Sequence, residues 1–374
     1  MRLFFVTGSL VHGGAERHAI TLANRFAERG HDVHFAYVKN DPSQLPRLQI
    51  PSTCLHAGRY FDFSALRTLR TLFTRTRPTA ILATNPYALM YASLARPAAP
   101  LAVALHSTWT RSAKEWLQMA AYRPFFWAAE RAMFVCERQM HHWRRRVLFS
   151  RTNQVIYNGV DLEYWAPQGS SPIRAVLGFA ESDFVIGLSA VLRPEKNPVQ
   201  LVEAVAMLRR RGIPARALMI GDGEMRPAIE AAATRHGIAD AVAITGLVQD
   251  VRPFLAACDA LALTSHTEAF SLAAIEAMAL GLPVVHADVG GAAEMIRPGH
   301  DGYLFPPGDT GTLVDCLAAL ADRERRLPMG RNARHTVETR FSERAMVERY
   351  EGSLTELASL RSKRESLRRS ATAH

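Results

Sequence analysis

Residues 264–309 read TSHTEAFSLAAIEAMALGLPVVHADVGGAAEMIRPGHDGYLFPPGD, and this stretch decides the fold. It holds two glutamates, Glu268 and Glu276, with seven residues between them, and the second lies in an apolar helical run. The segment 281–285 then reads as a turn and a buried strand, and Gly290-Gly291 opens a further helix. A loop, a helix, a strand and a second helix in this order are typical of an α/β sheet. Backbone N–H groups at a helix start bind anions, so the stretch predicts an anion site within reach of Glu276.

Short apolar strands alternate with helical patterns along the rest of the chain. Strands that are apolar throughout indicate a parallel sheet covered on both faces. A cluster of Pro, Gly and Ser at Pro167–Pro172 is the best candidate for a linker. The predicted strands are Arg2–Thr7, Val33–Val38, Ala80–Ala83, Leu101–Leu105 and Ala132–Val135 before the linker, and Asp183–Ser189, Ala217–Ile220, Ala241–Thr245, Ala260–Leu263 and Pro283–His286 after it. The predicted helices include Ala15–Arg29, Pro198–Arg211, Glu224–His236 and a long one from Phe341 onward.

The composition is that of an ordinary globular protein. The 374 residues are 48% hydrophobic and 21% charged, which fits two domains of ordinary size. No apolar run approaches the ~20 residues that span a bilayer, and the apolar N-terminal strand is too short for a signal peptide. The four cysteines form no close pairs, and no metal-ligand spacing is present. We therefore expect a cytoplasmic protein with reduced cysteines, no metal site and no cofactor.

The positive charge is concentrated in the first half of the chain. Residues 1–165 contain 21 basic and 10 acidic residues, a net charge of +11, whereas the remaining 209 residues contain 24 and 25, a net charge of −1. This asymmetry indicates an anionic partner: a membrane surface, nucleic acid or a charged acceptor. Nucleic-acid binding would leave the second half unexplained. Aromatic and basic residues alternate in one segment, which suits either an anionic membrane surface or a core with ordinary solvated arginines. These residues are Trp109, Arg111, Lys114, Trp116, Tyr122, Arg123, Phe125, Phe126, Trp127 and Arg131.

Two cations three residues apart, Arg193 and Lys196, follow the strand Asp183–Ser189. On a strand-end loop they suit a diphosphate, although a solvated helix turn would contain the same residues. Lysine is rare in this chain, with four lysines against 41 arginines. The compact ammonium group of Lys196 is therefore a specific choice rather than a drift of composition.

Glycine-rich turns follow two other strands. Gly13-Gly14 lies before the first helix, where glycines allow the backbone N–H groups to approach a phosphate closely. The pattern differs from the G-x-G-x-x-G of dinucleotide sites. Gly221-Asp222-Gly223 closes a strand of the second half, which any tight turn would also explain.

Taken together, these motifs resemble the nucleotide-sugar site of the retaining glycosyltransferases of family 4, which have the GT-B architecture. The resemblance implies an α/β fold of two doubly wound, Rossmann-like domains that face each other across a cleft. The domains are expected at residues 1–166 and 167–344. A C-terminal helix at about 345–374 is expected to cross back to the first domain.

The resemblance also implies roles for individual residues. Arg193 and Lys196 would meet the donor diphosphate, and Glu268 the transferred sugar. Many relatives have glycine where this chain has Ala269 and Ser271, which would reshape the sugar pocket. The implied catalytic residues are Arg193, Lys196, Glu268 and His106; the implied donor-binding residues are Gly13, Gly14, Gly221, Asp222, Gly223, Val248, Phe270, Ser271, Leu272 and Glu276, the last one through the ribose.

The implied activity is transfer of a sugar from a nucleotide diphosphate with retention of configuration. No Asp-x-Asp occurs in the chain, which fits a metal-independent enzyme. A UDP-sugar is the favoured donor and GDP-mannose the second choice. The acceptor is expected to be a glycan or a lipid-linked envelope compound, reached from the inner face of the membrane. Two alternatives remain: an epimerase or hydrolase, for which only His106 offers an acid or base, and a non-catalytic partner subunit.

Overall fold

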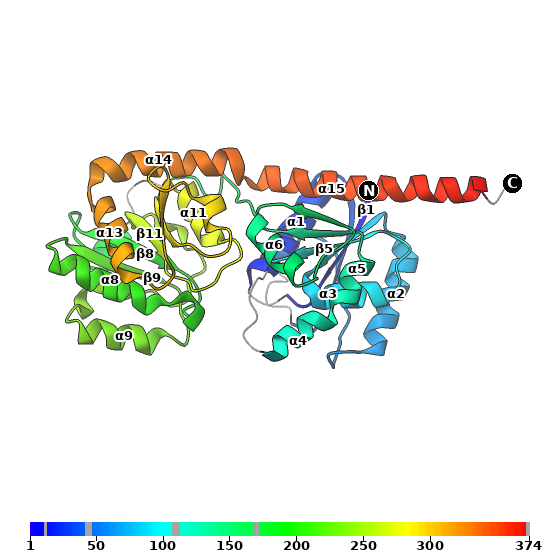
Figure 1. Ribbon diagram of the computed structural model, residues 1–374, viewed down its shortest axis with the longest axis horizontal. Helices are drawn as coiled ribbons and strands as arrows, with labels where there is room; N and C mark the ends of the chain where they lie inside the picture. The colour runs from blue at the N-terminus through cyan, green and yellow to red at the C-terminus, as the bar shows by residue number, and fades with distance from the viewer. Residues whose placement is uncertain (11–12, 42–46, 107–112, 168, 170–171, 372–374) are drawn as a thin grey trace. The chain divides into compact units, whose positions relative to one another are not determined.

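A computed structural model describes residues 1–10, 13–41, 47–106, 113–167, 169 and 172–371, with side chains undescribed at 113–115 and 361–371. The chain divides into two units (Figure 1). Unit 1 comprises Met1–Asn158 and Arg344–His374, and unit 2 comprises Gly159–Glu343. Among the described residues, no helix has both the length and the apolar character of a membrane span.

Unit 1 is built on a seven-stranded sheet in the order β3-β2-β1-β4-β5-β6-β7, and all its neighbouring strands are parallel. Every residue of β4 and β5 is buried, as expected for central strands that are covered on both faces. The strands are β1 (Arg2–Thr7), β2 (Asp32–Tyr37), β3 (Ser52–Cys54), β4 (Ala80–Thr84), β5 (Leu101–Leu105), β6 (Arg131–Phe134) and β7 (Thr152–Val155).

Helices cover both faces of this sheet because its strands are apolar at successive positions. Phe5 of β1 lies in a core cluster with Phe26 and Tyr350, from α1 and α15. The next side chain on the opposite face, Phe4, packs with Phe73 and residues of α3 and α5. The last helix of the chain is therefore part of unit 1. The helices are α1 (Gly14–Glu28), α2 (Phe63–Thr76), α3 (Asn85–Leu94), α4 (Ala113–Ala121), α5 (Arg123–Ala128), α6 (Glu137–Arg145) and α15 (Glu343–Ala371).

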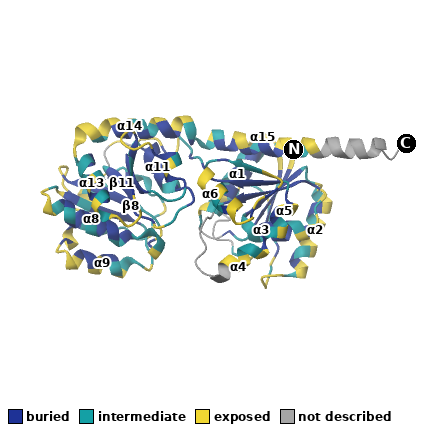
Figure 2. Ribbon diagram, in the orientation of Figure 1, coloured by how far each residue is buried: buried dark blue, intermediate teal, exposed yellow. Residues whose placement is uncertain are grey.

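Unit 2 contains a second parallel sheet, of six strands in the order β10-β9-β8-β11-β12-β13. The central strands of this sheet are largely buried and the outer sides of its helices are exposed, as Figure 2 shows. On one face α8 packs beside α9 and α13, and elsewhere α11 packs on α14. The strands are β8 (Phe184–Ser189), β9 (Ala215–Ile220), β10 (Val242–Ile244), β11 (Ala260–Leu263), β12 (Val284–Ala287) and β13 (Gly302–Phe305). The helices are α7 (Ile173–Val176), α8 (Pro198–Arg210), α9 (Arg226–Arg235), α10 (Arg252–Leu255), α11 (Leu272–Ala279), α12 (Ala292–Met295), α13 (Thr310–Ala321) and α14 (Arg323–Arg340), with 3-10 turns η2 (Pro194–Lys196) and η3 (Ala239–Ala241).

The predicted fold class of two doubly wound α/β units is confirmed. The long helix predicted from Phe341 is confirmed as α15, which begins at Glu343, and Ser342 pairs with Val160 between α14 and α15. Contacts place residues 159–166 in unit 2, because Val160 bridges to Ser342 and the Arg334 guanidinium donates to the carbonyl of Trp165 at 2.8 Å. Pro167–Pro172 lies partly outside the described residues.

The observed division makes the charge asymmetry larger. Unit 1 contains 28 basic and 12 acidic residues, a net charge of +16, and unit 2 contains 17 and 23, a net charge of −6. The increase arises because the basic C-terminal segment belongs to unit 1.

Candidate functional site

Arg193, Lys196 and Glu268 of unit 2 lie at the point where its strand order reverses. The chain leaves β8 toward β9 on one side, and it leaves β11 toward β12 on the other. Ligands of parallel sheets bind at the carboxyl ends of the two strands that flank such a point. The loop after β8 contains Arg193 and Lys196, and the loop after β11 contains Glu268. Topology thus places residues that are 72 positions apart in one location.

Lys196 and Glu268 form an ion pair at the centre of this location. The Lys196 Nζ lies 2.5 Å from the Glu268 Oε1, and the two side chains are 25% and 18% exposed. Both groups therefore remain accessible to a ligand. An anionic group of a ligand would pair with the Lys196 ammonium group, and a hydroxyl group of the same ligand would donate a hydrogen bond to the Glu268 carboxylate.

Hydrogen bonds lock the two loops to each other. The Thr264 Oγ1 donates to the carbonyls of Lys196 at 2.8 Å and Asn197 at 2.9 Å. The His266 N–H donates to the carbonyl of Glu195 at 2.8 Å. Asn197 adopts a left-handed backbone, φ 48°, so that η2 ends and α8 begins at once. The side chains of Lys196 and Glu268 therefore stand on one hydrogen-bonded support.

The Gly290-Gly291 pair fixes the Glu268 loop from the other side. Gly290 has φ 54°, and a Cβ atom there would lie 2.1 Å from the carbonyl oxygen of Glu268. The Gly291 N–H donates to the carbonyl of Ala269 at 2.8 Å. Only a glycine allows this close approach, so the pair positions the first glutamate of the motif.

The helix α11 begins directly behind that glutamate. The Ser271 hydroxyl accepts from the Ala274 N–H at 3.3 Å and caps the helix, while Phe270 is buried with its ring against Phe341. N–H groups in the first turn of a helix have no partner within the helix, and Leu272 is the first residue of this turn. Glu276, farther along α11, is 5% exposed.

The Gly221–Gly223 turn lies against the loop that contains Arg193. A Cβ atom on Gly221, φ 138°, would lie 2.0 Å from the carbonyl oxygen of Ala190, and one on Gly223 would lie 2.4 Å from that of Leu192. The Asp222 carboxylate accepts from the Gly223 N–H at 2.8 Å. The turn is thus packed beside the β8 loop. Val248 is half-buried on the next loop, after β10.

One residue near this location, His286, was missed by the sequence reasoning. It is the next-to-last residue of β12, opposite Leu263 of β11, and its Nδ1 lies 2.6 Å from the carbonyl oxygen of Ala287. Burial lowers the pKa of His286, whereas the negative charges of Glu268 and Asp288 act in the opposite direction. The ring therefore lies within electrostatic range of the ion pair. Its place at the carboxyl end of a strand next to β11 was the available signal.

The predicted residues of unit 1 lie at the carboxyl edge of its own sheet. His106 follows β5, and its backbone N–H donates to the Asn85 Oδ1 at 3.3 Å. Its ring packs on His18 of α1 at 4.3 Å between centroids, and its buried Nε2 has no hydrogen-bond partner in the described part of the chain. Burial lowers the pKa of His106 to about 4, so the ring is neutral near pH 7. A neutral His106 donates one hydrogen bond from the ring nitrogen that carries the proton and accepts one at the other nitrogen.

Gly13 and Gly14 stand at the start of α1, with Gly13 as its N-cap. A Cβ atom on Gly13 would lie 2.4 Å from the Glu16 Oε2, so the glutamate folds back over the helix start. Burial raises the pKa of Glu16. A phosphate at this helix start would have to share it with the Glu16 carboxyl group.

The aromatic and basic segment of unit 1 is partly core and partly surface. Tyr122 and Phe126 are buried, as is Arg131, which forms an ion pair with Glu356 at 2.9 Å. Trp116 and Trp127 are 46% and 48% exposed. Trp109 and Arg111 lie outside the described residues, and so does the side chain of Lys114.

Two family models match the chain. The model described as Glycosyltransferase Family 4 matches residues 12–164, and the model described as Glycosyl transferases group 1 matches residues 170–336. The chain belongs to the family 4 glycosyltransferases. The motif 264–309 lies entirely within the second match.

Curated relatives match this family 4 chain over about half of its length. N-acetyl-alpha-D-glucosaminyl L-malate synthase of Bacillus anthracis is 32% identical over 200 residues, which are 53% of this chain and 52% of that protein. D-inositol 3-phosphate glycosyltransferase of Nocardia farcinica is 37% identical over 194 residues, which are 48% of this chain and 42% of that protein. The chain spans about half the length of the curated relatives that it matches.

Solved structures share the fold over nearly the whole chain. Anabaena Alr3699/HepE in complex with UDP-glucose is similar with a TM-score of 0.84 and 24% identity, and the match covers 95% of this chain and 100% of that one. The predicted GT-B fold is thereby confirmed. Within the described residues of this family 4 chain, no group of three or more His, Cys, Asp or Glu is arranged to hold a metal ion.

Proposed function

We propose that the chain is a retaining, metal-independent glycosyltransferase that uses a nucleotide diphosphate sugar, with a UDP-sugar as the first choice and GDP-mannose as the second. The observation that carries the proposal is the accessible Lys196–Glu268 pair at the strand-order reversal of unit 2. A cation and a carboxylate side by side match a donor in which an anionic diphosphate is joined to a sugar rich in hydroxyls. HepE, whose structure includes UDP-glucose, has the same fold.

The chemistry follows from the charge that develops in the reaction. The bond between the sugar C1 and the β-phosphate oxygen breaks, and C1 bonds to the acceptor oxygen on the same face. The acceptor proton moves to the departing phosphate. The negative charge of the UDP or GDP product is met by Arg193, Lys196 and the N–H groups at the start of α11. Because the loop of Lys196 and the segment before α11 are already held in place by the contacts of Thr264 and Gly290, little reorganisation of these two segments accompanies the step.

The remaining roles are proposed by position. Glu268 would bind the transferred sugar and Glu276 the ribose, while the Gly221–Gly223 turn and Val248 would line the nucleotide. In unit 1, Gly13 and Gly14 would bind the donor diphosphate, and the neutral His106 would offer a hydrogen bond to the donor sugar.

The proposed ribose role of Glu276 is tested by calorimetry. UDP is expected to bind with EDTA present, and Glu276→Ala to weaken that binding at least about tenfold, because a hydrogen bond to a charged group is worth about 1.5–3 kcal/mol. GDP and ADP run in parallel identify the base preference.

The exposed Glu181, which precedes β8, supplies the control: Glu181→Ala should bind UDP like the parent protein. Unchanged UDP affinity in Glu276→Ala would disprove the ribose role. Absence of binding by UDP, GDP and ADP alike would favour an epimerase, a hydrolase or a non-catalytic subunit.

We further propose that the acceptor is lipid-linked and that unit 1 meets an anionic membrane surface. Five exposed apolar residues, here called the aromatic patch, are Tyr60, Phe61, Phe63, Trp116 and Leu117. Tyr60 and Phe61 precede α2, Phe63 begins it, and the other two residues lie on α4. Gln118 of α4 joins these segments by donating to the Tyr60 hydroxyl at 2.8 Å. The start of α2 lies at the carboxyl edge of the sheet, because its other end leads into β4. The net charge of +16 on unit 1 supports the choice of an anionic surface.

Vesicle sedimentation tests this surface. The parent protein should sediment with vesicles that contain phosphatidylglycerol and stay in solution with phosphatidylcholine alone. Phe63→Ser with Leu117→Ser, which alters side chains that are 78% and 63% exposed, should lower binding about tenfold or more because each buried apolar side chain contributes about 1.5–3 kcal/mol.

Val176 of unit 2 is 76% exposed, so Val176→Ser is the matched control. No preference for phosphatidylglycerol, or an equal loss in the control, would refute the membrane proposal. The acceptor would then be sought among water-soluble anions.

A further inference from the structure

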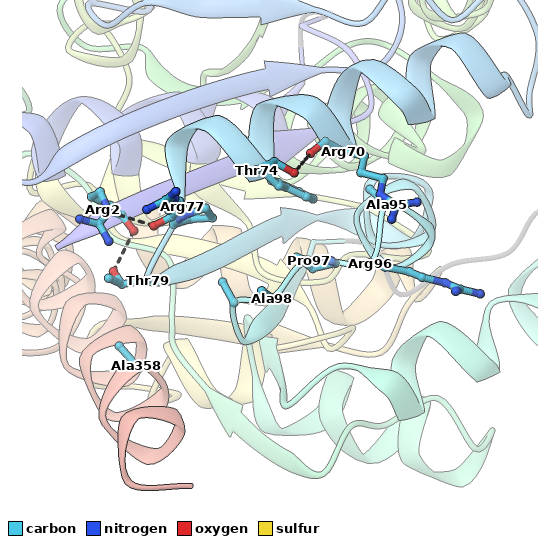
Figure 3. A pocket seen from close by; sticks show the side chains of 13 residues that line it. Arg2, Arg70, Thr74, Arg77, Thr79, Ala95, Arg96, Pro97, Ala98 and Ala358 are labelled. Carbon is cyan, nitrogen blue, oxygen red and sulfur yellow. Dashed lines mark hydrogen bonds between the residues drawn. The ribbon is translucent and has the colours of Figure 1, made fainter. Parts of the chain in front are cut away.

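A hollow of about 620 Å³ lies at the amino edge of the unit 1 sheet, and four arginines line it: Arg2, Arg70, Arg77 and Arg96 (Figure 3). Arg2 begins β1, Arg70 lies in α2, and Arg77 and Arg96 follow the ends of α2 and α3. The strands are parallel, so this edge is opposite to the one that holds Gly13, Gly14 and His106. The hollow is therefore not part of the proposed transfer site.

No described acidic side chain balances the positive charge of this hollow. No acidic residue lines it, and none of the four guanidinium groups is in an ion pair with a described carboxylate. Asp32 is the register neighbour of Arg2, but its carboxylate lies 3.3 Å from His34. The carboxyl ends of two helices together offer only about one negative charge. Four arginines exceed that by far.

One of the four arginines, Arg2, has a structural role. The Arg2 Nε donates to the carbonyl of Arg77 at 2.8 Å and so helps to cap the end of α2. No comparable bond is recorded for Arg70 or Arg96 within the described chain. In Figure 3, Arg2 and Arg77 lie toward one end of the hollow, and Arg70 and Arg96 lie toward the other.

Two of the arginines occupy positions that disfavour any side chain. Arg77 has φ 46° and Arg96 has φ 51°. Residues just after a helix in this left-handed conformation are usually glycine, because a Cβ atom is strained there. Glycine would fit both turns with less strain, so folding alone does not account for arginine at the two places. A ligand that needs the guanidinium groups does account for it.

The rest of the lining shows what kind of ligand would fit. The Thr74 hydroxyl donates to the carbonyl of Arg70 at 2.9 Å, and the Thr79 hydroxyl donates to the carbonyl of Arg2 at 2.8 Å. The other lining side chains are apolar, among them Phe73, Pro97 and Ala358. Guanidinium groups are thus the main polar donors, and their planar forks match the oxygens of a phosphate group.

We propose that the arginine hollow is a second binding site, which takes a phosphate-bearing ligand whose body packs on the apolar floor. The phosphate belongs either to a soluble compound or to a lipid head group. Because the four arginines are exposed, binding should weaken steeply as the salt concentration rises.

The test compares two double variants that remove the same charge from unit 1. Arg77→Gly with Arg96→Gly removes two lining arginines at the strained positions. Arg67→Ala with Arg75→Ala removes two arginines of α2 that do not line the hollow. All proteins carry Lys196→Ala, so that pyrophosphate bound at the proposed donor site beside Glu268 contributes less to the measured binding. Calorimetry with inorganic pyrophosphate at low salt tests the soluble source, and sedimentation with phosphatidylglycerol vesicles tests the lipid source.

We expect the glycine pair to lose at least about tenfold in pyrophosphate binding, with a thermal midpoint equal to or above that of the parent, while the alanine pair binds like the parent. If only vesicle binding shows this selective loss, the phosphate is that of a lipid head group, and the site stands. Equal losses in both pairs, or no binding of either probe by the parent, would overturn the proposal. So would a lower thermal midpoint in the glycine pair, which would mean that the arginines are structural.

Discussion

Replacing Lys196 by alanine is expected to lower the turnover number by about 10²–10³-fold, because one preorganised donor to a developing oxyanion is worth that much. Lys196 is the cation next to Glu268, at 2.5 Å, and both loops that hold them are bonded together. The loss should appear in kcat rather than in the affinity for the nucleotide sugar, since the charge on the departing diphosphate grows only as the sugar bond breaks. Initial rates at saturating donor, with loss of the donor sugar followed directly, measure it.

Two variants make this result specific. Arg211→Ala removes one positive charge from an exposed ion pair with Asp315, at the far end of α8, and should leave kcat unchanged. Lys196→Arg keeps the charge but replaces a compact ammonium by a planar fork, so it should recover only part of the rate. Near-normal turnover in Lys196→Ala would show that the lysine serves only as the partner of Glu268.

The site in unit 2 was predictable because its signals are local. Arg193, Lys196 and Glu268 stand on the loops that follow strand ends, and the carboxyl ends of parallel strands lie at one edge of a sheet. It was therefore enough to recognise that Lys196 and Glu268 follow two strands, β8 and β11, to expect them together. The glycines were recognised as turns or as the start of a helix, but the contacts that they make were not predicted. Only the coordinates show that Gly290 lies against the carbonyl of Glu268.

Unit 1 was less predictable because its important contacts join distant segments. His18, His106 and Tyr350 come from α1, from the end of β5 and from α15, and no spacing in the sequence connects them. The amino-edge arginines also come from separate elements, and each resembles an ordinary surface residue by itself. Burial likewise divides the aromatic segment between core and surface, which its sequence did not reveal: Phe126 lies in the core and the adjacent Trp127 is exposed.

That histidine cluster gives the second large expected effect, a loss of unit 1 stability in mild acid. Burial lowers the pKa of His18 well below its usual value of 6.5, with the charge of His106 adding to the shift, and it lowers the pKa of His106 to about 4. The other group that faces them, the Tyr350 hydroxyl, is buried and its pKa is raised, so it stays neutral. Below pH 6.5 the unfolded chain binds protons that the folded unit does not. The contribution of the two neutral histidines to the free energy of unfolding is therefore fully present above pH 6.5, and it is lost as the pH drops toward about 4.

The size of this loss follows from about 1.4 kcal/mol per pH unit for each histidine. At pH 5 the two histidines together should remove about 2–4 kcal/mol, a large part of the 5–15 kcal/mol that is typical of a domain. Urea unfolding followed by tryptophan fluorescence reports mainly on unit 1, which contains all of the five tryptophans except Trp165. His18→Gln should reduce the pH dependence by about half, whereas His141→Gln, at an exposed position of α6, should leave it intact. Equal stability at pH 7 and pH 5 would mean that both rings take up protons in the folded unit over the same pH range as in the unfolded chain. Burial would then not hold His106 neutral, and the ring would already be charged at pH 5, which contradicts the description of His106 as a desolvated, neutral hydrogen-bonding group.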